Sequence, residues 1–352
     1  MQRKAFVRHW GAVAVCAAVV FAAPYAGSTA GAQSLAEFYK GRTVTVVCGI
    51  AAGGGYDLSA RIFARHLGKH IPGNPTVIVQ NMPGANSVIA ANYVYGIAPQ
   101  DGTAIWTGSR STPYEPLMGN AAAKFDVKKL HWLGSTSSEI AVVIAWHTAP
   151  HQTAADLFKI PLVVGAVDRG AENFLFPNAL NNLIGTKFKI VRGYSNQGAI
   201  TLAMQRGEVQ GDCNTAWSNL PTVHGDWLRE KKIRLLMQLA LTRHPELPDL
   251  PLALDFAKTD EQRETLKVLL GMKAFGYPFF IGPDVPPDRV KALKDAFAAT
   301  MADPEFRADI KTLLREITPQ TGTEMDTVIG AAYSHPPEVL EKIRAALTTS
   351  AN

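Results

Sequence analysis

The stretch "GRTVTVVCGIAAGGGYDLSAR", residues 41–61, predicts a β-strand, a glycine loop and a helix in immediate succession. The β-branched run at its start is typical of a buried strand. From Leu58 onward, apolar side chains recur at helical spacing. Gly53, Gly54 and Gly55 separate the two elements. Glycine readily adopts positive φ and lets a ligand contact the main chain, and the following helix N-terminus favours an anion.

Two nucleotide-binding motifs were compared with this loop, and neither fits it. A P-loop has the form GxxxxGK[ST], but Tyr56 and Asp57 follow Gly55 here. The dinucleotide fingerprint GxGxxG requires a third glycine where Leu58 stands. Two interpretations remain: backbone amides that hold a non-nucleotide anion such as a carboxylate, and a tight strand–helix turn without a ligand.

The N-terminus has the pattern of a secretory signal peptide. Three basic residues precede the apolar run of residues 10–24, which is too short for a typical membrane span, and A-x-A stands at residues 30–32. We therefore predict a signal peptide over residues 1–32, a mature chain that begins near Gln33, and a periplasmic location. Lipidation at Cys16 is disfavoured because the bulky Val15 precedes it.

The composition of the mature chain limits its partners. Removal of the three basic residues of the signal peptide lowers the formal net charge from +5 to +2, and no Lys/Arg run remains. We therefore expect no nucleic-acid partner. About 320 residues suffice for one large or two medium domains. Cys48 and Cys213 lie in or beside apolar runs, and we expect both to be buried free thiols.

Strand and helix patterns alternate along the chain, which predicts an α/β fold with mixed, mostly parallel sheets. Strands are expected at residues 76–81 and 102–109, and polar or glycine residues follow each of them. Such residues lie at the carboxyl edge of a sheet, where open α/β sheets bind ligands. Residues 161–173 repeat the order of strand, glycine-bearing loop and helix, which indicates a second lobe built like the first.

An ordered set of motifs resembles the Bug family, the periplasmic receptors of tripartite tricarboxylate transporters. The set consists of "AAGGGYD" at 51–57, "NMPGA" at 81–85, "PQDGT" at 99–103, and glycine turns at 192–193 and 207–209. The resemblance covers nearly all of residues 40–315. It departs from the family pattern at Tyr56, which is large, at Asn86, which replaces a glycine, and at Arg110 and Arg169.

This resemblance implies a two-lobed periplasmic binding protein of the type II-like class, with two crossover strands between its lobes. We expect residues 33–137 and 235–352 to form lobe 1, and residues 138–234 to form lobe 2. The implied partners are a small carboxylate and the membrane subunits of a tripartite tricarboxylate transporter. We expect a monomer without a cofactor or metal.

The predicted ligand contacts come from loops of both lobes. Arg110 and Arg169 can each grip a carboxylate with two hydrogen bonds, and a surface or interlobe salt bridge is the alternative. For Asp57 we expect that it braces its own loop, because a carboxylate repels an anion. The predicted set is Gly53, Gly54, Gly55, Tyr56, Asp57, Gly84, Ala85, Asn86, Ser109, Arg110, Asp168, Arg169, Gly170, Gln197 and Asp212.

The candidates for catalysis are incomplete, so we expect no enzyme. "GYSNQG" at 193–198 misses the nucleophile elbow G-x-S-x-G by one residue. His66 and His70 have zincin spacing, but Leu67 occupies the position of the general base. Two other functions stay open: a receptor for an aromatic acid or amino acid in another import system, and a secreted hydrolase.

Overall fold

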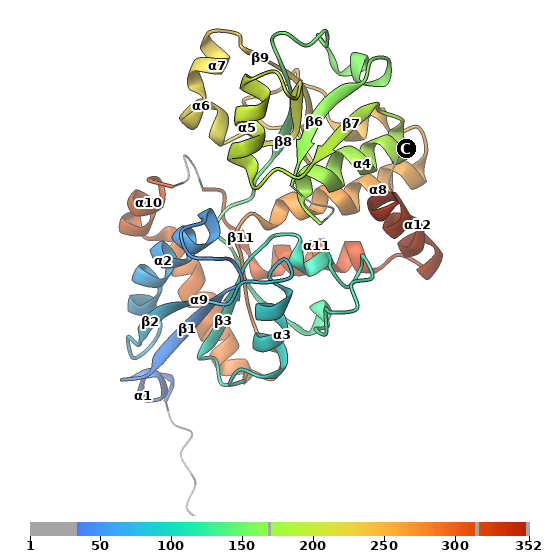
Figure 1. Cartoon of the computed structure of the whole chain (residues 1–352). Helices are drawn as coiled ribbons and strands as arrows, with labels where there is room; N and C mark the ends of the chain where they lie inside the picture. The colour runs from blue at the N-terminus through green and yellow to red at the C-terminus, as the bar shows by residue number, and fades with distance from the viewer. Residues whose placement is uncertain (1–33, 168–169, 314–316, 350–352) are drawn as a thin grey trace, which may run out of the picture. The chain divides into compact units, whose positions relative to one another are not determined.

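The computed structural model describes residues 34–167, 170–313 and 317–349 (Figure 1). The predicted signal peptide, residues 1–32, lies outside the described residues, as do Asp168 and Arg169. From Leu35 onward the chain is one compact unit with two mixed sheets and helices packed on them.

The first sheet has the strand order β11-β4-β10-β3-β1-β2. β1 (Thr43–Cys48) pairs in parallel with β2 (Thr76–Asn81) and β3 (Ala104–Thr107). The ends of these three strands therefore lie at one edge of the sheet. The remaining pairs of this sheet are antiparallel and involve β10 (Pro278–Ile281), β4 (His131–Ser135) and β11 (Gln320–Thr321).

The sequence signals place most helices of the first lobe, the part built on this sheet. α9 begins at Pro287, because proline fits the first helical turn. A Thr–Glu capping box begins α11. These helices are α1 (Leu35–Tyr39), α2 (Gly55–Leu67), α3 (Val88–Gly96), α9 (Pro287–Ala302), α10 (Pro304–Ile310) and α11 (Gly322–Tyr333), with 3-10 turns η1 (Gly68–His70), η2 (Thr112–Tyr114) and η3 (Val127–Lys129).

The second sheet has the order β7-β6-β8-β5-β9. β6 (Leu162–Ala166) is parallel to β7 (Phe188–Arg192) and β8 (Gly211–Ala216), and β5 (Ala141–Trp146) is antiparallel to β8 and β9 (Ile233–Leu239). The helices of this part, the second lobe, are α4 (Glu172–Ile184), α5 (Gln197–Gln205), α6 (Asn219–Val223), α7 (Gly225–Arg229) and the 3-10 turn η4 (Ala154–Phe158).

The two sheets confirm the predicted two-lobed α/β class, with pairing that is more evenly mixed than predicted. The predicted lobe boundary at residue 235 falls inside β9, which pairs with β5 along its length. The first crossing is the short segment 136–140. The return crossing from β9 to β10 contains η5 (Ala253–Phe256), α8 (Asp260–Gly271) and η6 (Met272–Phe275).

The C-terminal helix α12 (Pro337–Thr348) lies against the second lobe, whereas the predicted range 235–352 assigned it to the first (Figure 1). Asn178 and Asn182 of α4 donate hydrogen bonds to main-chain carbonyls at its end. Ile343 and Leu347 are fully buried in the large core cluster that also includes residues of α4. Burial of this apolar face is the reason that α12 packs on α4.

Cys48 and Cys213 are both buried free thiols, as predicted. Within the described residues, no helix has the length and apolar character that a membrane crossing requires.

Candidate ligand-binding site

The carboxylate of Asp57 holds the glycine loop between β1 and α2 in place. Its Oδ2 accepts a hydrogen bond of 2.8 Å from the main-chain N–H of Gly53. Arg61 lies 2.9 Å from its Oδ1, and Asn81 Nδ2 donates to the same oxygen at 2.8 Å. Burial alone raises the pKa of Asp57, but these hydrogen bonds and the charge of Arg61 outweigh it and lower the pKa. Asp57 is therefore occupied inside the loop, in the bracing arrangement expected from the sequence.

The three glycines of this loop do not share one conformation. Gly53 uses the positive φ that glycine allows, at +88°, whereas Gly54 has a φ of −79° and Gly55 is the first residue of α2. The helix thus begins within the glycine run. A Cβ on Gly54 would lie 3.4 Å from Ile50 Cγ2, and one on Gly55 would lie 3.6 Å from Tyr277 Oη. Neither backbone conformation nor existing neighbours demand glycine at these two positions.

Ser87, which was not predicted from the sequence, joins the three loops that follow β1, β2 and β3. Its Oγ donates to the carbonyl of Gly49 and accepts from the main-chain N–H of Ser109, both at 3.1 Å. A Cβ on Gly49 or Gly108 would lie 2.3 or 2.7 Å from the Cβ of Ser87. Both glycines are therefore required by this close approach. A glycine directly after a strand is the sequence signal that points to such a contact.

The second loop, after β2, is strained. Gly84 has a φ of +138°, and Ala85, Asn86 and Ser87 follow it at 45°, 51° and 68°. Such conformations cost about 1–3 kcal/mol for each non-glycine residue and persist where surrounding contacts hold them. Here the side chain of Asn86 donates to Ser111 Oγ (2.8 Å) and Glu115 Oε1 (2.6 Å), and its carbonyl accepts from Thr112 Oγ1 (2.8 Å). The strain is located in a predicted ligand loop.

Tyr56 and Arg110 connect the first loop to the third. The phenol oxygen of Tyr56 accepts from the main-chain N–H of Arg110 at 3.1 Å and from its Nε at 3.2 Å. The ring of Tyr56 lies 5.0 Å from that of Tyr277. Burial raises the pKa of Tyr277 to about 12, so its phenol stays neutral. Arg110 Nη1 is buried and finds no hydrogen-bond partner among the described residues.

Arg110 also contacts the second lobe. Its Nε lies 3.3 Å from Oε1 of Glu172, the first residue of α4, and Oε2 of Glu172 lies 2.6 Å from Lys273 Nζ. Burial raises the pKa of Glu172, but the two cations outweigh it and lower the pKa to about 2. Glu172 is therefore ionised at neutral pH. Lys273 belongs to η6, in the return crossing between the lobes.

A set of polar side chains around Asp212, inside the second lobe, extends the contacts of Glu172 and Lys273. Asp212 is buried in β8 and accepts from Gln197 Nε2 (2.5 Å), Thr215 Oγ1 (2.8 Å) and the main-chain N–H of Asn214 (3.0 Å). The side chain of Asn214 contacts both Glu172 and Lys273. The predicted residues Gln197 and Asp212 are thus linked to Glu172 through Asn214. Lys273, Asn214 and Glu172 were not predicted from the sequence.

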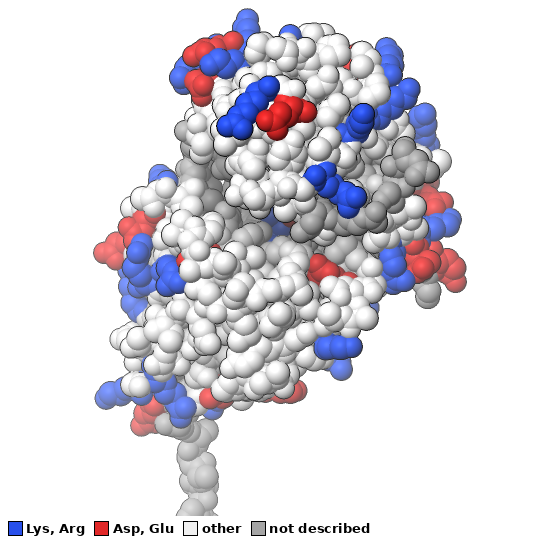
Figure 2. Space-filling view, viewed as in Figure 1, with Lys and Arg blue, Asp and Glu red and all other residues white. Residues whose placement is uncertain are grey.

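The predicted site residues divide into two groups in the structure. One contact within the first loop links Gly53 to Asp57. Contacts between the first-lobe loops link Tyr56 to Arg110 and Ser87 to Ser109, and Arg110 reaches the second lobe through Glu172. Asp168 and Arg169 lie outside the described residues, and Gly170 is exposed beside them. Figure 2 shows that the surface is hollowed between the two lobes, with a basic side chain visible at its floor.

The histidine pair considered as a zincin site is engaged elsewhere. His66 and His70 contact Asp309 (2.9 Å) and Asp303 (3.0 Å) in α10 and the residue before it. His66, Asp303 and Glu305 lie close enough to hold a metal, but Lys69 Nζ contacts both carboxylates at 2.6 and 2.5 Å. The lysine ammonium therefore supplies the cation of this cluster.

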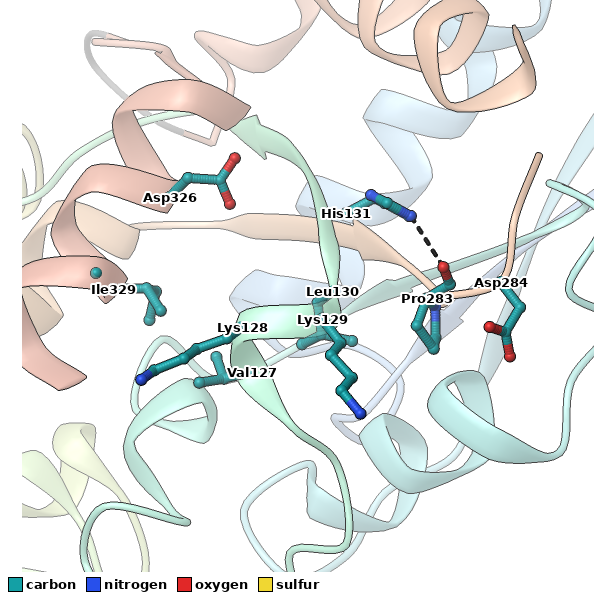
Figure 3. Close-up of a pocket in the computed structure, with 10 residues that line it drawn as sticks. Val127, Lys128, Lys129, Leu130, His131, Pro283, Asp284, Asp326 and Ile329 are labelled. Atoms are coloured by element: carbon teal, nitrogen blue, oxygen red, sulfur yellow. Dashed lines mark hydrogen bonds between the residues drawn. The ribbon is translucent and has the colours of Figure 1, made fainter. Parts of the chain in front are cut away.

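Figure 3 shows a pocket that lies apart from the predicted ligand loops. It has a volume of about 580 Å³, and His131 Nε2 lies 3.0 Å from the carbonyl of Pro283 at its rim. Its lining contains none of the predicted site residues: it consists of Val127, Lys128, Lys129, Leu130, His131, Pro283, Asp284, Asp326, Ile329 and Gly330.

Comparisons with known proteins agree with this fold. The family model TctC, described as the tripartite tricarboxylate transporter family receptor, matches residues 60–317. The chain belongs to this family of periplasmic substrate-binding receptors.

Individual relatives are distant in sequence. A "UPF0065 protein in gbd 5' region" from Cupriavidus necator is 26% identical over 326 residues, or 88% of each chain. A TctC solute-binding protein from Polaromonas has a similar solved structure, with a TM-score of 0.66, 17% identity, and coverage of 88% of this chain and 98% of that one. MatC from Rhodopseudomonas palustris, solved with bound malate, has a TM-score of 0.58, 20% identity, and coverage of 87% and 99%.

Proposed function

We propose that the exported chain is a periplasmic receptor that captures a small carboxylate between its two lobes and delivers it to the membrane subunits of a tripartite tricarboxylate transporter. Family membership supports the receptor class and the kind of membrane partner. The malate bound to MatC, a protein of the same fold, supports a carboxylic acid as the kind of ligand. The signal-peptide pattern of residues 1–32 supports export.

The observation that carries this proposal is the guanidinium of Arg110. It lies where the third loop of the first lobe meets α4 of the second, and its Nη1 is buried without a partner among the described residues. A buried donor without an acceptor costs free energy, about 1–3 kcal/mol or more for a charged group. A ligand carboxylate satisfies this donor with a charge-assisted hydrogen bond.

The first-lobe loops supply the rest of the proposed cradle. Gly54 and Gly55 present main-chain amides at the N-terminus of α2, where the helix dipole favours an anion. The space beside their Cα atoms holds no atom closer than 3.4 Å to an added Cβ. Asn86 and Ser109 carry polar side chains in the two neighbouring loops. Ser87 fixes the distance between these loops, so the amides and Arg110 keep one geometry.

Closure of the lobes is the proposed capture step. A ligand shifts an equilibrium toward the closed form only by its tighter binding to that form. Arg110 and Glu172 are the contacting charges from opposite lobes, so a ligand bound to Arg110 lies within reach of both lobes. Rotation about the crossing segments is the expected motion.

A ligand screen of the mature chain, residues 33–352, tests this proposal. Mono-, di- and tricarboxylates, aromatic acids and amino acids are tested by thermal shift, and acids that raise Tm are then titrated by calorimetry. We expect at least one small carboxylate to bind with 1:1 stoichiometry. Turnover of a carboxylic ester panel, or the absence of binding by every carboxylate, contradicts the proposal.

A further inference from the structure

The two lobes meet at a small cluster of charges that contains two cations and one carboxylate between them. Arg110 comes from the first lobe, Glu172 from the second and Lys273 from the return crossing. Their side chains are 16%, 14% and 4% exposed. Burial of an unpaired charge at such a position costs free energy. The charges of the cluster therefore determine which charged groups of a ligand can bind there.

Lys273 is already neutralised by groups of the protein. Its Nζ lies 2.6 Å from Glu172 Oε2 and also donates to the side-chain oxygen of Asn214. The ammonium lies 4.5 Å from the centre of the Phe176 ring, a favourable cation–π contact. A ligand anion gains little from Lys273, because it would have to compete with Glu172 for the same proton donors.

Arg110 is only partly engaged. Its Nε is shared between Tyr56 Oη at 3.2 Å and Glu172 Oε1 at 3.3 Å, while Nη1 has no partner among the described residues. The guanidinium is planar and can bind one carboxylate with two parallel hydrogen bonds. The cluster therefore offers one further anion a strong contact, on the Arg110 side.

Other carboxylates of the region oppose a second anion. Glu139 acts electrostatically on both Arg110 and Lys273, and Ser218 Oγ donates to it at 2.7 Å. Asp212 is 3% exposed and reaches Glu172 through Asn214. Among the described residues on the second-lobe side, a ligand thus meets carboxylates and amides, and Lys273 is already paired with Glu172.

We propose that Glu172 sets the charge of the ligand: it occupies the place of a second ligand carboxylate, so that the site selects acids with a single carboxylate group over di- and tricarboxylates of similar size. This inference rests on the proposed function and narrows its ligand class. The selection works by exclusion, since a second carboxylate directed at the second lobe is repelled by Glu172, and Lys273, which Glu172 already neutralises, does not repay its lost hydration.

The test compares two four-carbon acids that differ in charge, together with a larger tricarboxylate. Butanoate, succinate and propane-1,2,3-tricarboxylate are titrated by calorimetry into the mature wild-type chain and into Glu172→Gln. Glu172→Asp keeps the charge and serves as the conservative variant. Glu208→Gln removes the same charge from an exposed position of the same lobe, with a side chain that is 52% exposed, and serves as the control.

We expect the wild type to bind butanoate at least tenfold more tightly than succinate, and the tricarboxylate more weakly still. Glu172→Gln should lower this ratio of butanoate affinity to succinate affinity at least tenfold, while Glu172→Asp and Glu208→Gln leave it nearly unchanged.

A wild-type preference for succinate overturns the inference without any variant, even if Glu172→Gln does not fold. An unchanged ratio in a folded Glu172→Gln also overturns it. If none of the three acids binds but another carboxylate of the wider screen does, the same affinity ratio is measured between that acid and an analogue of equal length with one carboxylate more or fewer. If no carboxylate binds at all, the proposed function fails as well.

Discussion

Two charged clusters of this protein contain similar residues but differ in what they leave unpaired. The first, the α2–α10 cluster, includes the pair of Arg65 with Asp309 and the contacts of Lys69 and His70, in η1 just after α2, with Asp303, just before α10, at 2.6 and 3.0 Å. All of these residues belong to one lobe. At the lobe interface, Arg110 and Glu172 contact each other at 3.3 Å across two lobes. The first cluster satisfies its own charges, and the second retains a buried donor, Arg110 Nη1. Residue types alone therefore do not distinguish the two clusters, and the unpaired donor is the reason that we propose the second as the ligand site.

The largest expected effect of a substitution is on ligand affinity at the interface cluster. Arg110→Ala removes the buried donor and should weaken binding of the best carboxylate by about 1.5–3 kcal/mol, as for a charged hydrogen bond. Calorimetry measures the change. Arg65→Ala in the α2–α10 cluster, where the guanidinium is 61% exposed and pairs with Asp309, is the control and should leave affinity unchanged. Equal affinities of wild type and Arg110→Ala would show that the buried donor is not used.

The second effect concerns the loop that presents main-chain amides to the ligand. Gly54→Val should lose about tenfold in affinity, about 1.4 kcal/mol, because the side chain fills the proposed ligand space. The fold should persist, since Gly54 has a φ of −79° and an added Cβ has only ordinary contacts. Gly96→Val, at an exposed position with no atom within 4 Å of an added Cβ, is the matched control. Thermal melts measure a loss of stability, and calorimetry measures a loss of affinity. Full affinity in a folded Gly54→Val would contradict the proposal that the amides of this loop hold the ligand.

The third prediction concerns the stability of the protein at acidic pH, which should depend on Glu172. Because the folded-state pKa of Glu172 is lowered from 4.5 to about 2, its ion pair stabilises the protein fully above pH 4.5. This contribution is lost as the pH falls from 4.5 toward 2. In Glu172→Gln the free energy of unfolding should therefore depend less steeply on pH in this window. Urea unfolding at several pH values between 2 and 4.5 measures how the free energy of unfolding depends on pH. Equal pH dependence in wild type and Glu172→Gln would show that Glu172 does not contribute to it.

The smallest effect is expected at the α2–α10 cluster. Hydrogen bonds from Lys69 and His70 lower the pKa of Asp303, so its contribution is present above the usual value of 3.8 and is lost as the pH falls below it. Lys69 is 42% exposed, and salt screens such pairs. The Tm difference between wild type and Asp303→Asn should therefore shrink at high salt, whereas that of Glu172→Gln should not. A salt-independent difference at Asp303 would contradict this contrast.

Local sequence patterns predicted the parts of the site that depend on neighbouring residues. The strand, loop and helix of residues 41–61 and the bracing role of Asp57 follow from short-range signals, and the structure contains both. The sequence shows that each glycine of this loop can adopt positive φ, but it does not show that α2 begins at Gly55 and that, of the three, Gly53 is the one with positive φ. The contact of Arg110 with the other lobe was one of two alternatives that the sequence left open.

The remainder of the site depends on contacts between distant segments. Lys273 and Glu172 are 101 residues apart in the sequence, and only the return crossing through α8 and η6 brings them together. Lys273 has no local motif that distinguishes it from a surface lysine. Likewise, α12 packs on α4 through an apolar face that several partners could have covered. Tertiary packing decides such contacts, and a single sequence does not specify them.

The central claim is that Arg110 and the glycine loop hold a ligand carboxylate between the lobes. A crystal structure of the mature chain with the best-binding acid tests it most directly. We predict a carboxylate oxygen within about 3.2 Å of Arg110 Nη1, the range of a protein hydrogen bond, and a second contact to the amide of Gly54 or Gly55, directly or through one water. An acid bound elsewhere, for example in the pocket beside His131, with Arg110 Nη1 still unpaired, would contradict the account.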